Sequence, residues 1–165
     1  FTPGVFDLLF KGEEDPSRIR TTIAKQLALM VVLYSPLQMA ADLPRNYDEK
    51  LELFQFIKDV PADWQKSLPL DGDVGEFVVY ARQQRDSDNW FVGGITNEQA
   101  RSFELNFDFL DEGDYLATLY RDGADADWQS NPYSTVIESL EVNNQSTLGI
   151  DMAPGGGFAI SVIKR

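Results

Sequence analysis

The sequence predicts an α+β chain with two unlike parts, a helical segment over residues 1–60 and an antiparallel, all-β sandwich over residues 61–165. One observation behind this prediction is a nearly unbroken apolar helical pattern over residues 19–34. The other is the alternation of apolar and polar residues after Pro61. A helix this apolar must be buried on most sides. We therefore expect the helical segment to be one edge of a larger α/β body, covered by elements from outside this chain or from a second copy.

Composition and charge narrow the classes of function. The chain has 165 residues, of which 43% are hydrophobic, so it can bury a core of its own. Its net charge is −13, and the acidity is concentrated in residues 61–165, which hold 7 Lys and Arg against 18 Asp and Glu. Such an acidic surface repels phosphate backbones and anionic lipids, which excludes nucleic-acid and membrane-surface roles. The apolar run over residues 27–34 is too short for membrane insertion, which needs roughly 20 residues.

Histidine and cysteine are both absent from the sequence. Their absence excludes Ser-His-Asp chemistry, imidazole bases, cysteine nucleophiles and thiolate metal sites. Any chemistry in this chain would have to use carboxylates, Lys, Tyr or an oxygen-ligated cation.

The helical segment begins with a helix and a short apolar run. Asp15 suits the N-cap of the first helix and Pro16 its first position, while Pro36 ends it. The apolar run over residues 37–41 could form a buried parallel strand before a second helix. Helix, strand and helix in this order are typical of a β/α barrel or a doubly wound sheet, and one such repeat cannot fold alone.

The second helix is predicted over residues 47–60. Its buried face would consist of Leu51, Phe54 and Ile57, with Leu53 at the margin. The pattern is amphipathic, which is typical of a helix at the surface of a domain.

From Gly75 onward the sequence predicts seven strands, separated by polar or glycine-rich turns. Regularly spaced short strands of this kind are typical of a small β-sandwich. The predicted strands span residues 76–82, 90–96, 101–107, 115–121, 134–142, 147–152 and 158–163.

Long runs of the sequence resemble glycoside hydrolase family 97, and together they extend over essentially the whole chain. They include the segments Ser-Pro-Leu-Gln-Met-Ala-Ala-Asp in the helical part and Asn-Trp-Phe-Val-Gly-Gly-Ile-Thr in the β part. The matching runs cover residues 2–6, 20–29, 34–42, 54–60, 88–96, 120–128 and 154–161.

The resemblance implies a parent enzyme with an N-terminal β-sandwich, a (β/α)8 barrel and a C-terminal β-sandwich. Residues 1–60 would be the last βα units of the (β/α)8 barrel, and residues 61–165 the C-terminal β-sandwich, an ancillary and oligomerisation domain. The parent would be a secreted or periplasmic α-glycosidase of the α-glucosidase or α-galactosidase type, acting on an α-linked oligosaccharide substrate. This chain would pack against the upstream catalytic barrel and could form a homo-oligomer.

The resemblance also implies chemistry by paired carboxylates and a bound calcium ion, all held upstream of Thr2. It therefore assigns no catalytic residue and no metal ligand to this chain, and it implies that the chain alone is inactive. Barrel active sites lie at the C-terminal ends of strands, so Thr2, Pro3 and Gly4 could border the rim of the substrate cleft. The alternative is a plain structural turn.

Other acidic residues have ordinary explanations. The run over residues 13–15 lies in a polar loop, whereas glycosidase carboxylates face each other across a cleft. Two clusters resemble calcium loops in composition but lack the spacing of an EF-hand. They are Asp122, Asp125 and Asp127, and Asp71, Asp73 and Glu76.

Trp64, Trp90 and Trp128 leave two functions open. As an exposed row on one sheet face they would stack against sugars, and the chain would be a carbohydrate-binding module of the same enzyme. Buried tryptophans would instead favour structural support of the barrel and of subunit association, which is the interpretation we prefer.

Overall fold

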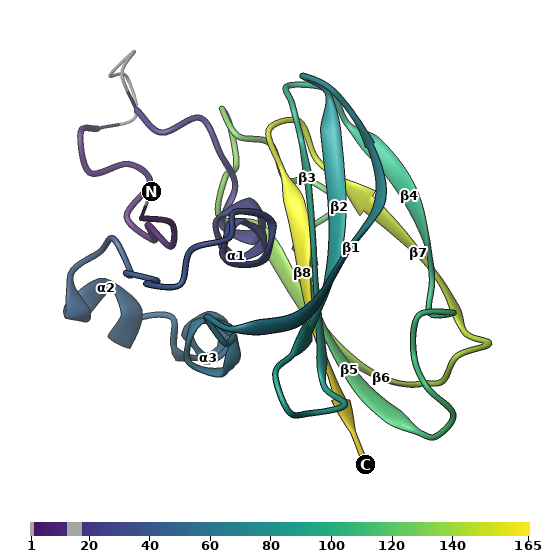
Figure 1. Cartoon of the computed structure of the whole chain (residues 1–165). Coiled ribbons are helices and arrows are strands. Elements are labelled where there is room, and N and C mark those ends of the chain that lie inside the picture. The colour runs from purple at the N-terminus through teal and green to yellow at the C-terminus, as the bar shows by residue number, and fades with distance from the viewer. Residues whose placement is uncertain (1, 13–17) are drawn as a thin grey trace.

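Two β-sheets pack face to face, and helices cover the outer face of the larger sheet (Figure 1). The structure is a computed structural model that describes residues 2–12 and 18–165. Within these residues the helices are α1 (Ile23–Val32), α2 (Pro44–Asp48) and α3 (Leu51–Asp59). The chain therefore forms three layers, with the larger sheet in the middle.

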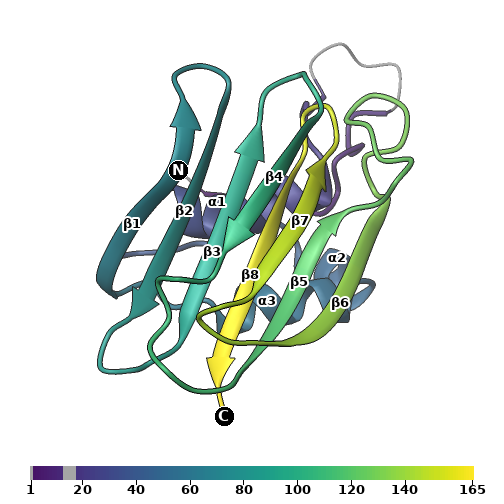
Figure 2. The ribbon, with the colours of Figure 1, turned by 90° about the vertical axis from the view of Figure 1, so that its right-hand side faces the viewer.

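The strand pairs are antiparallel, as predicted for the sandwich. The larger sheet has six strands in the order β1-β2-β3-β8-β5-β6, and β4 pairs with β7 in the second sheet (Figure 2). The seven predicted strands are confirmed as β2 to β8. The strands are β1 (Trp64–Asp73), β2 (Phe77–Gln84), β3 (Trp90–Thr96), β4 (Arg101–Asn106), β5 (Tyr115–Asp122), β6 (Thr135–Val142), β7 (Thr147–Met152) and β8 (Gly157–Lys164).

The sequence analysis missed β1, which lies at the edge of the larger sheet next to β2. Most of its residues are exposed, and its pairing shifts register between Trp64 and Lys66 and again between Pro69 and Asp71. Edge strands tolerate proline and polar side chains because one of their sides has no partner strand. The apolar alternation that reveals a strand is therefore weak in this segment.

The space between the two sheets holds the first hydrophobic core. Val79, Trp90 and Phe158 are buried there from the larger sheet, and Leu105 and Ile150 from the smaller one. Successive residues of a strand point to opposite faces, so every second side chain enters this core. The core-packing interpretation of Trp90 is confirmed.

A second core lies between the helices and the outer face of the larger sheet. Ile23, Leu27 and Met30 of α1 are at most 1% exposed and belong to one cluster with Phe91 and Tyr120 of the sheet. The expectation that the buried face of this helix is covered from outside the chain is wrong, because the chain's own sheet covers it. β3 and β8 are apolar on both faces for the same reason.

The helix α1 approaches the sheet closely at Gly93. A Cβ atom at this position would lie 2.7 Å from the Ala28 carbonyl oxygen and 2.9 Å from Val31 Cβ. Any side chain here would therefore push the helix away from the sheet.

α1 is shorter than the predicted helix over residues 19–34. It begins after Thr22, whose hydroxyl accepts a hydrogen bond from the Lys25 N–H at 3.3 Å and so caps the helix. The predicted start at Asp15 and Pro16 lies outside the described residues, as does the acidic run over residues 13–15.

The end of α1 comes before Pro36. The side-chain Nε2 of Gln38 donates to the carbonyl oxygens of Met30 and Leu33, both at 3.3 Å. These bonds satisfy carbonyl groups that a further helical turn would otherwise use. The helix therefore ends at Val32.

The buried parallel strand expected over residues 37–41 is not observed. Leu37 and Met39 are 69% and 52% exposed, and the Ala41 N–H donates to the Pro3 carbonyl oxygen at 3.2 Å. The prediction is wrong for this chain because, among the described residues, no strand lies beside the segment to complete a ladder.

The second predicted helix is divided into α2 and α3 by a turn at Glu49 and Lys50. Because of the turn, α3 presents a different face to the core than one continuous helix would. Phe56 is fully buried and Leu51 is 57% exposed. The predicted buried face is therefore wrong at Leu51. The Phe56 ring packs edge-on against the Tyr120 ring at 5.3 Å between centroids.

Candidate functional site

The predicted cleft-rim residues lie in a segment that other side chains hold in place. Thr2 is exposed, whereas Pro3 and Gly4 are buried. Gly4 has a φ of +88°, which favours glycine, and a Cβ there would lie 2.8 Å from the Met30 side chain. Its N–H donates to Gln26 Oε1 of α1 at 3.1 Å. The turn is thus rigidly attached to α1.

Asp42 anchors the same segment from the other side. Its Oδ2 accepts hydrogen bonds from the N–H groups of Phe6 and Asp7 at 2.6 and 2.7 Å, and its Oδ1 accepts one from Asn46 at 2.5 Å. Burial alone would raise the pKa of Asp42, but the bonds from Asp7, Asn46, Leu43 and Phe6 outweigh it and hold the pKa below its usual value. Asp42 is therefore a structural carboxylate that stays ionised.

Tyr47 of α2 completes this anchor. Its hydroxyl donates to the Gly4 carbonyl oxygen at 2.8 Å and accepts from the Asp42 N–H at 3.0 Å. A cavity of about 470 Å³ lies next to it, with Val5, Asp7 and Asp42 among its lining residues. Val5 and Asp7, which follow the anchored turn, thus form part of the wall of a cavity.

Arg82 of β2 joins the sandwich to the end of α1. Its Nε donates to the Val31 carbonyl oxygen at 2.6 Å, its Nη2 to that of Val32 at 3.3 Å, and its Nη1 to Ser67 Oγ at 2.5 Å. A cation at this place also complements the partial negative charge of a helix C-terminus. Burial lowers the pKa of Arg82, but a guanidinium stays charged.

The start of α1 is attached to the sandwich as well. The Ile23 N–H donates to the Pro132 carbonyl oxygen at 3.0 Å, and the Thr22 N–H to that of Gly155 at 3.3 Å. Lys25 Nζ donates to the Thr96 carbonyl oxygen at the end of β3 at 2.6 Å. Burial lowers the pKa of Lys25, an effect that Asp122 and Glu98 partly oppose.

Asp122 lies buried under the start of α1. Its Oδ2 accepts from the N–H groups of Ala153 and Gly157 at 2.9 and 2.8 Å. Burial raises the pKa of Asp122 to about 6, although the two N–H groups, the neighbouring Thr22 hydroxyl and the Lys25 charge lower it. Within the described residues, Oδ1 is buried and accepts no hydrogen bond of standard geometry. Asp122 thus holds the loop before β8 at a cost in desolvation.

The acidic clusters that resemble calcium loops do not gather around a common point. Asp125 accepts hydrogen bonds from Asn131 and Ser134, and Asp127 accepts from the N–H groups that follow it in its turn. Glu76 forms an ion pair with Arg101. Across residues 2–12 and 18–165, no group of three acidic side chains could hold a metal ion. These residues therefore do not fit a calcium site.

The tryptophans do not form an exposed row. Trp64 and Trp90 are buried in different cores, and Trp128 is half-buried with its side chain against Gly155. The Arg20 guanidinium lies over the Trp128 ring at 5.5 Å from the centroid. This arrangement favours the structural interpretation over sugar stacking.

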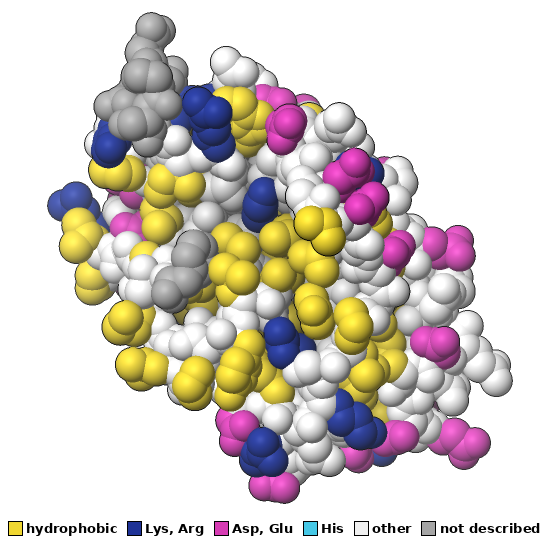
Figure 3. Space-filling model, turned by 45° about the horizontal axis from the view of Figure 1, so that its top comes forward, with side chains coloured by type: hydrophobic (Ala, Val, Ile, Leu, Met, Phe, Trp, Pro, Cys, Tyr) yellow, Lys and Arg dark blue, Asp and Glu magenta, His cyan; other side chains and the backbone are white. Residues whose placement is uncertain are grey.

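A cavity of about 480 Å³ opens between the start of α1 and the β1–β2 turn. We call it the hairpin groove, lined by the apolar residues Val74, Phe77, Val78 and Ile95 and by Lys25. Hydrophobic side chains gather in the middle of the face shown in Figure 3, and acidic side chains lie mostly toward its right-hand edge. The groove is therefore suited to an apolar occupant.

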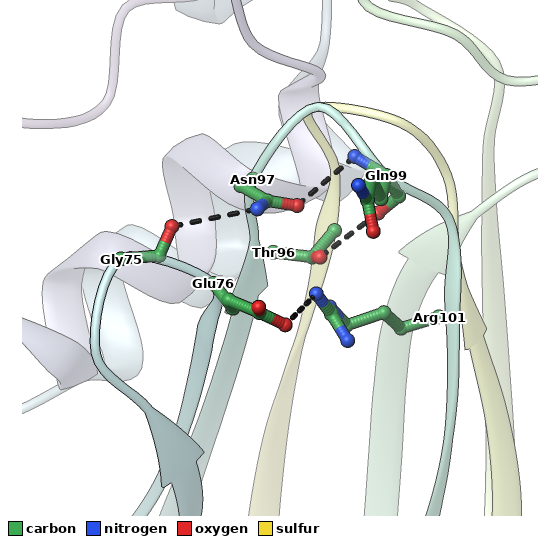
Figure 4. Close-up of polar contacts among 6 residues, drawn as sticks. All are labelled: Gly75, Glu76, Thr96, Asn97, Gln99 and Arg101. Carbon is green, nitrogen blue, oxygen red and sulfur yellow. Dashed lines mark hydrogen bonds and ion pairs between the residues drawn. The ribbon is translucent and has the colours of Figure 1, made fainter.

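The rim of the hairpin groove is held by contacts between two loops (Figure 4). The Asn97 N–H donates to the Glu76 carbonyl oxygen at 2.7 Å. The side-chain Nδ2 of Asn97 donates to the Gly75 carbonyl oxygen at 3.4 Å. The Gln99 N–H donates to Asn97 Oδ1 at 3.0 Å, and Arg101 pairs with Glu76. The rim is thus formed before any partner binds.

A family model described as "Glycosyl-hydrolase 97 C-terminal, oligomerisation" matches residues 63–163. The chain belongs to this family. The match begins one residue before β1 and ends one residue before the end of β8, so it spans the whole sandwich. The resemblance to glycoside hydrolase family 97 is confirmed.

Relatives of this family 97 chain are enzymes. It is 42% identical over 141 residues to a retaining α-galactosidase of Bacteroides thetaiotaomicron, covering 86% of this chain and 21% of that protein. It is 31% identical over 160 residues to a probable retaining α-galactosidase of Streptomyces bingchenggensis, covering 96% of this chain and 22% of that protein. The chain thus spans about a fifth of the length of these curated relatives.

Solved structures share the fold of this family 97 chain. A glycoside hydrolase family 97 enzyme from Pseudoalteromonas sp. strain K8, in complex with acarbose, matches with a TM-score of 0.96 and 49% identity, covering 100% of this chain and 26% of that one. A β-arabinopyranosidase matches with a TM-score of 0.70 and 27% identity, covering 90% of this chain and 22% of that one. In the part of the chain that the structure describes, no helix is long and apolar enough to cross a membrane.

Proposed function

We propose that the chain is the C-terminal part of a longer family 97 α-glycosidase. In this proposal, residues 1–60 complete the catalytic (β/α)8 barrel. Residues 61–165 form the sandwich that supports the barrel and joins subunits. The description of the family as an oligomerisation domain supports the second role.

The distribution of exposed apolar side chains carries this proposal. Seven of the ten large hydrophobic residues that are exposed in the described part of the chain lie between positions 10 and 51, although this segment is about a quarter of the chain. They are Phe10, Leu33, Tyr34, Leu37, Met39, Leu43 and Leu51. A concentration of exposed apolar side chains is typical of an interaction site, and this one lies on the segment proposed to complete the barrel.

The proposed substrate is an α-linked oligosaccharide. The relatives include retaining α-galactosidases, and one related family 97 enzyme was solved with acarbose and in a variant form with panose. We keep both α-galactosides and α-glucosides as candidates. In this proposal the catalytic carboxylates lie in the preceding part of the parent, as the resemblance to family 97 implies.

Three further features belong to the same proposal. Calcium would be held by the preceding part of the parent, because the described acidic residues do not gather. Thr2, Pro3 and Gly4 would form part of the cleft rim, since they directly precede Val5, which lines the cavity of about 470 Å³. The parent would act outside the cytoplasm, in the periplasm or the medium.

The test compares the natural gene product with this chain alone. The intact mass of the natural product and its hydrolysis of aryl α-galactosides and aryl α-glucosides, with and without a chelator, are measured. The parent should be several times heavier than this chain and active, while the chain alone should be inactive. A natural product with the mass of this chain would contradict the proposal, as would turnover by the chain itself.

A further inference from the structure

We infer that the hairpin groove binds an amphipathic α-helix from the preceding part of the same polypeptide. The inference rests on the proposed function, because it requires that such a part exists. It adds which surface of the chain receives the preceding part and what kind of element occupies it.

The helix layer leaves part of the larger sheet uncovered. α1 lies over β3 and β8, with α3 beside it, and the helices lie on one face of the sheet (Figure 1). Val79 and Ala81 of β2 point into the sandwich core, so Val78 and Tyr80 point to the helix-facing side. Both are only half-buried. In the described ranges α1 reaches this side of β2 at Arg82, whereas Val78, next to the β1–β2 turn, lines the open groove.

The flank of α1 that carries Lys25 is also less completely buried than its sheet-facing side. Lys25, Leu29 and Val32 share this flank, since residues at i, i+4 and i+7 lie on one side of a helix. Leu29 and Val32 are each 9% exposed, whereas Ile23, Leu27 and Met30 on the sheet-facing side are at most 1% exposed. Val74 is 100% exposed at the opposite rim. The groove thus has an apolar floor at Val78 and Ile95, Val74 at one rim and Lys25 of α1 at the other.

The chemistry of the groove favours a helix as the occupant. Val78 and Ile95 are cross-strand partners, so their backbone groups are already used between β2 and β3. An extended segment lying on this face would find few backbone partners, and a buried unpaired peptide group is costly. A helix satisfies its backbone groups internally and packs about 8–10 Å from its neighbour, which suits a place beside α1.

Two observations favour the preceding part of the polypeptide over a second copy. The match with a related family 97 structure covers 100% of this chain but 26% of that one. Most of that relative therefore lies outside the matched part. A second copy would bring a net charge of −13 to a groove whose lining already includes Asp73 and Glu76. In the described residues its own helices are also already packed.

The test is photo-crosslinking in the intact parent. A photo-reactive phenylalanine analogue replaces Val74 or Val78, and the attached peptide is identified by mass spectrometry. Thr147, exposed on β7 in the opposite layer, carries the same analogue as the control. Mixing isotope-labelled and unlabelled parent separates crosslinks within one polypeptide from crosslinks between copies.

We expect both groove probes to attach to one peptide that precedes this chain, at residues spaced by three or four, while the Thr147 probe does not reach it. Attachment to a second copy would overturn the inference, and so would the absence of any crosslink or a spacing of two residues. The proposed function fails separately, through the mass and activity of the parent. A parent that is active but uncrosslinked at the groove would therefore refute only this inference.

Discussion

Replacing Arg82 by Met should loosen α1 from the sandwich and destabilise the whole chain. The change removes three hydrogen bonds and leaves the Val31 and Val32 carbonyl groups buried without their charged donor. Hydrogen bonds to a charged group contribute about 1.5–3 kcal/mol each, so the two shortest bonds represent roughly 3–6 kcal/mol. Burial of the guanidinium, which lowers its pKa, opposes this gain. We therefore expect a loss of about 3 kcal/mol, near the lower end of the range.

Urea unfolding of the 165-residue chain measures the effect of the Arg82→Met change. For a urea dependence of about 2 kcal/mol per molar, the midpoint should fall by roughly 1.5 M. Arg82→Lys keeps a charge but loses the planar fork, so its midpoint should lie between the two. Arg85→Met is the matched control, because Arg85 lies just after β2 and forms an exposed ion pair with Asp63. If Arg82→Met and Arg85→Met unfold at the same midpoint, the guanidinium does not fix the helix and the reasoning fails.

Three other predictions follow from single groups. Because the folded-state pKa of Asp122 is raised from 3.8 to about 6, the wild type should lose roughly 2 kcal/mol relative to Asp122→Asn as pH rises from 4 to 7. Urea midpoints across that range measure this loss, and a difference independent of pH would contradict it. Gly93→Ala should cost about 1–3 kcal/mol in thermal unfolding, because its Cβ meets the Ala28 backbone, whereas Gly149→Ala has open space and should cost little. The isolated chain should not hydrolyse aryl α-galactosides or aryl α-glucosides, and turnover lost on changing one of its carboxylates would refute the proposed location of the active site.

The sequence predicted the strands of the sandwich because alternation is a local signal. β2 to β8 each alternate between more and less exposed residues or are apolar on both faces, and turns separate them clearly. β1 lacked that signal because it is a polar edge strand that contains Pro69. The ends of α1 were wrong because they depend on Thr22 and on Gln38, which reaches back over five and eight residues.

The candidate sites were harder to predict because they are built from distant residues. Arg82 meets α1 across about 50 positions, and Asp122 meets the loop before β8 across about 30. One signal was available. Val78, Tyr80 and Arg82 alternate with the core residues Val79 and Ala81, so Arg82 lies on the outer face of the sheet, where a hydrogen-bond acceptor could meet it. A helix C-terminus is such a partner, but sequence alone does not say which one.

The two parts of the chain share a core and are therefore firmly joined. Phe91 and Tyr120 of the sheet are buried by Phe56 and Leu27 of the helical segment, and α1 is bonded to the sandwich at both ends. A joint with this much buried contact does not bend like a polar linker between domains. A subunit contact made by the sandwich would therefore hold the helical segment, and the barrel proposed to include it, at a fixed orientation to the partner. We expect substitutions that weaken the α1 joint, such as Arg82→Met in the parent, to reduce activity and subunit association together.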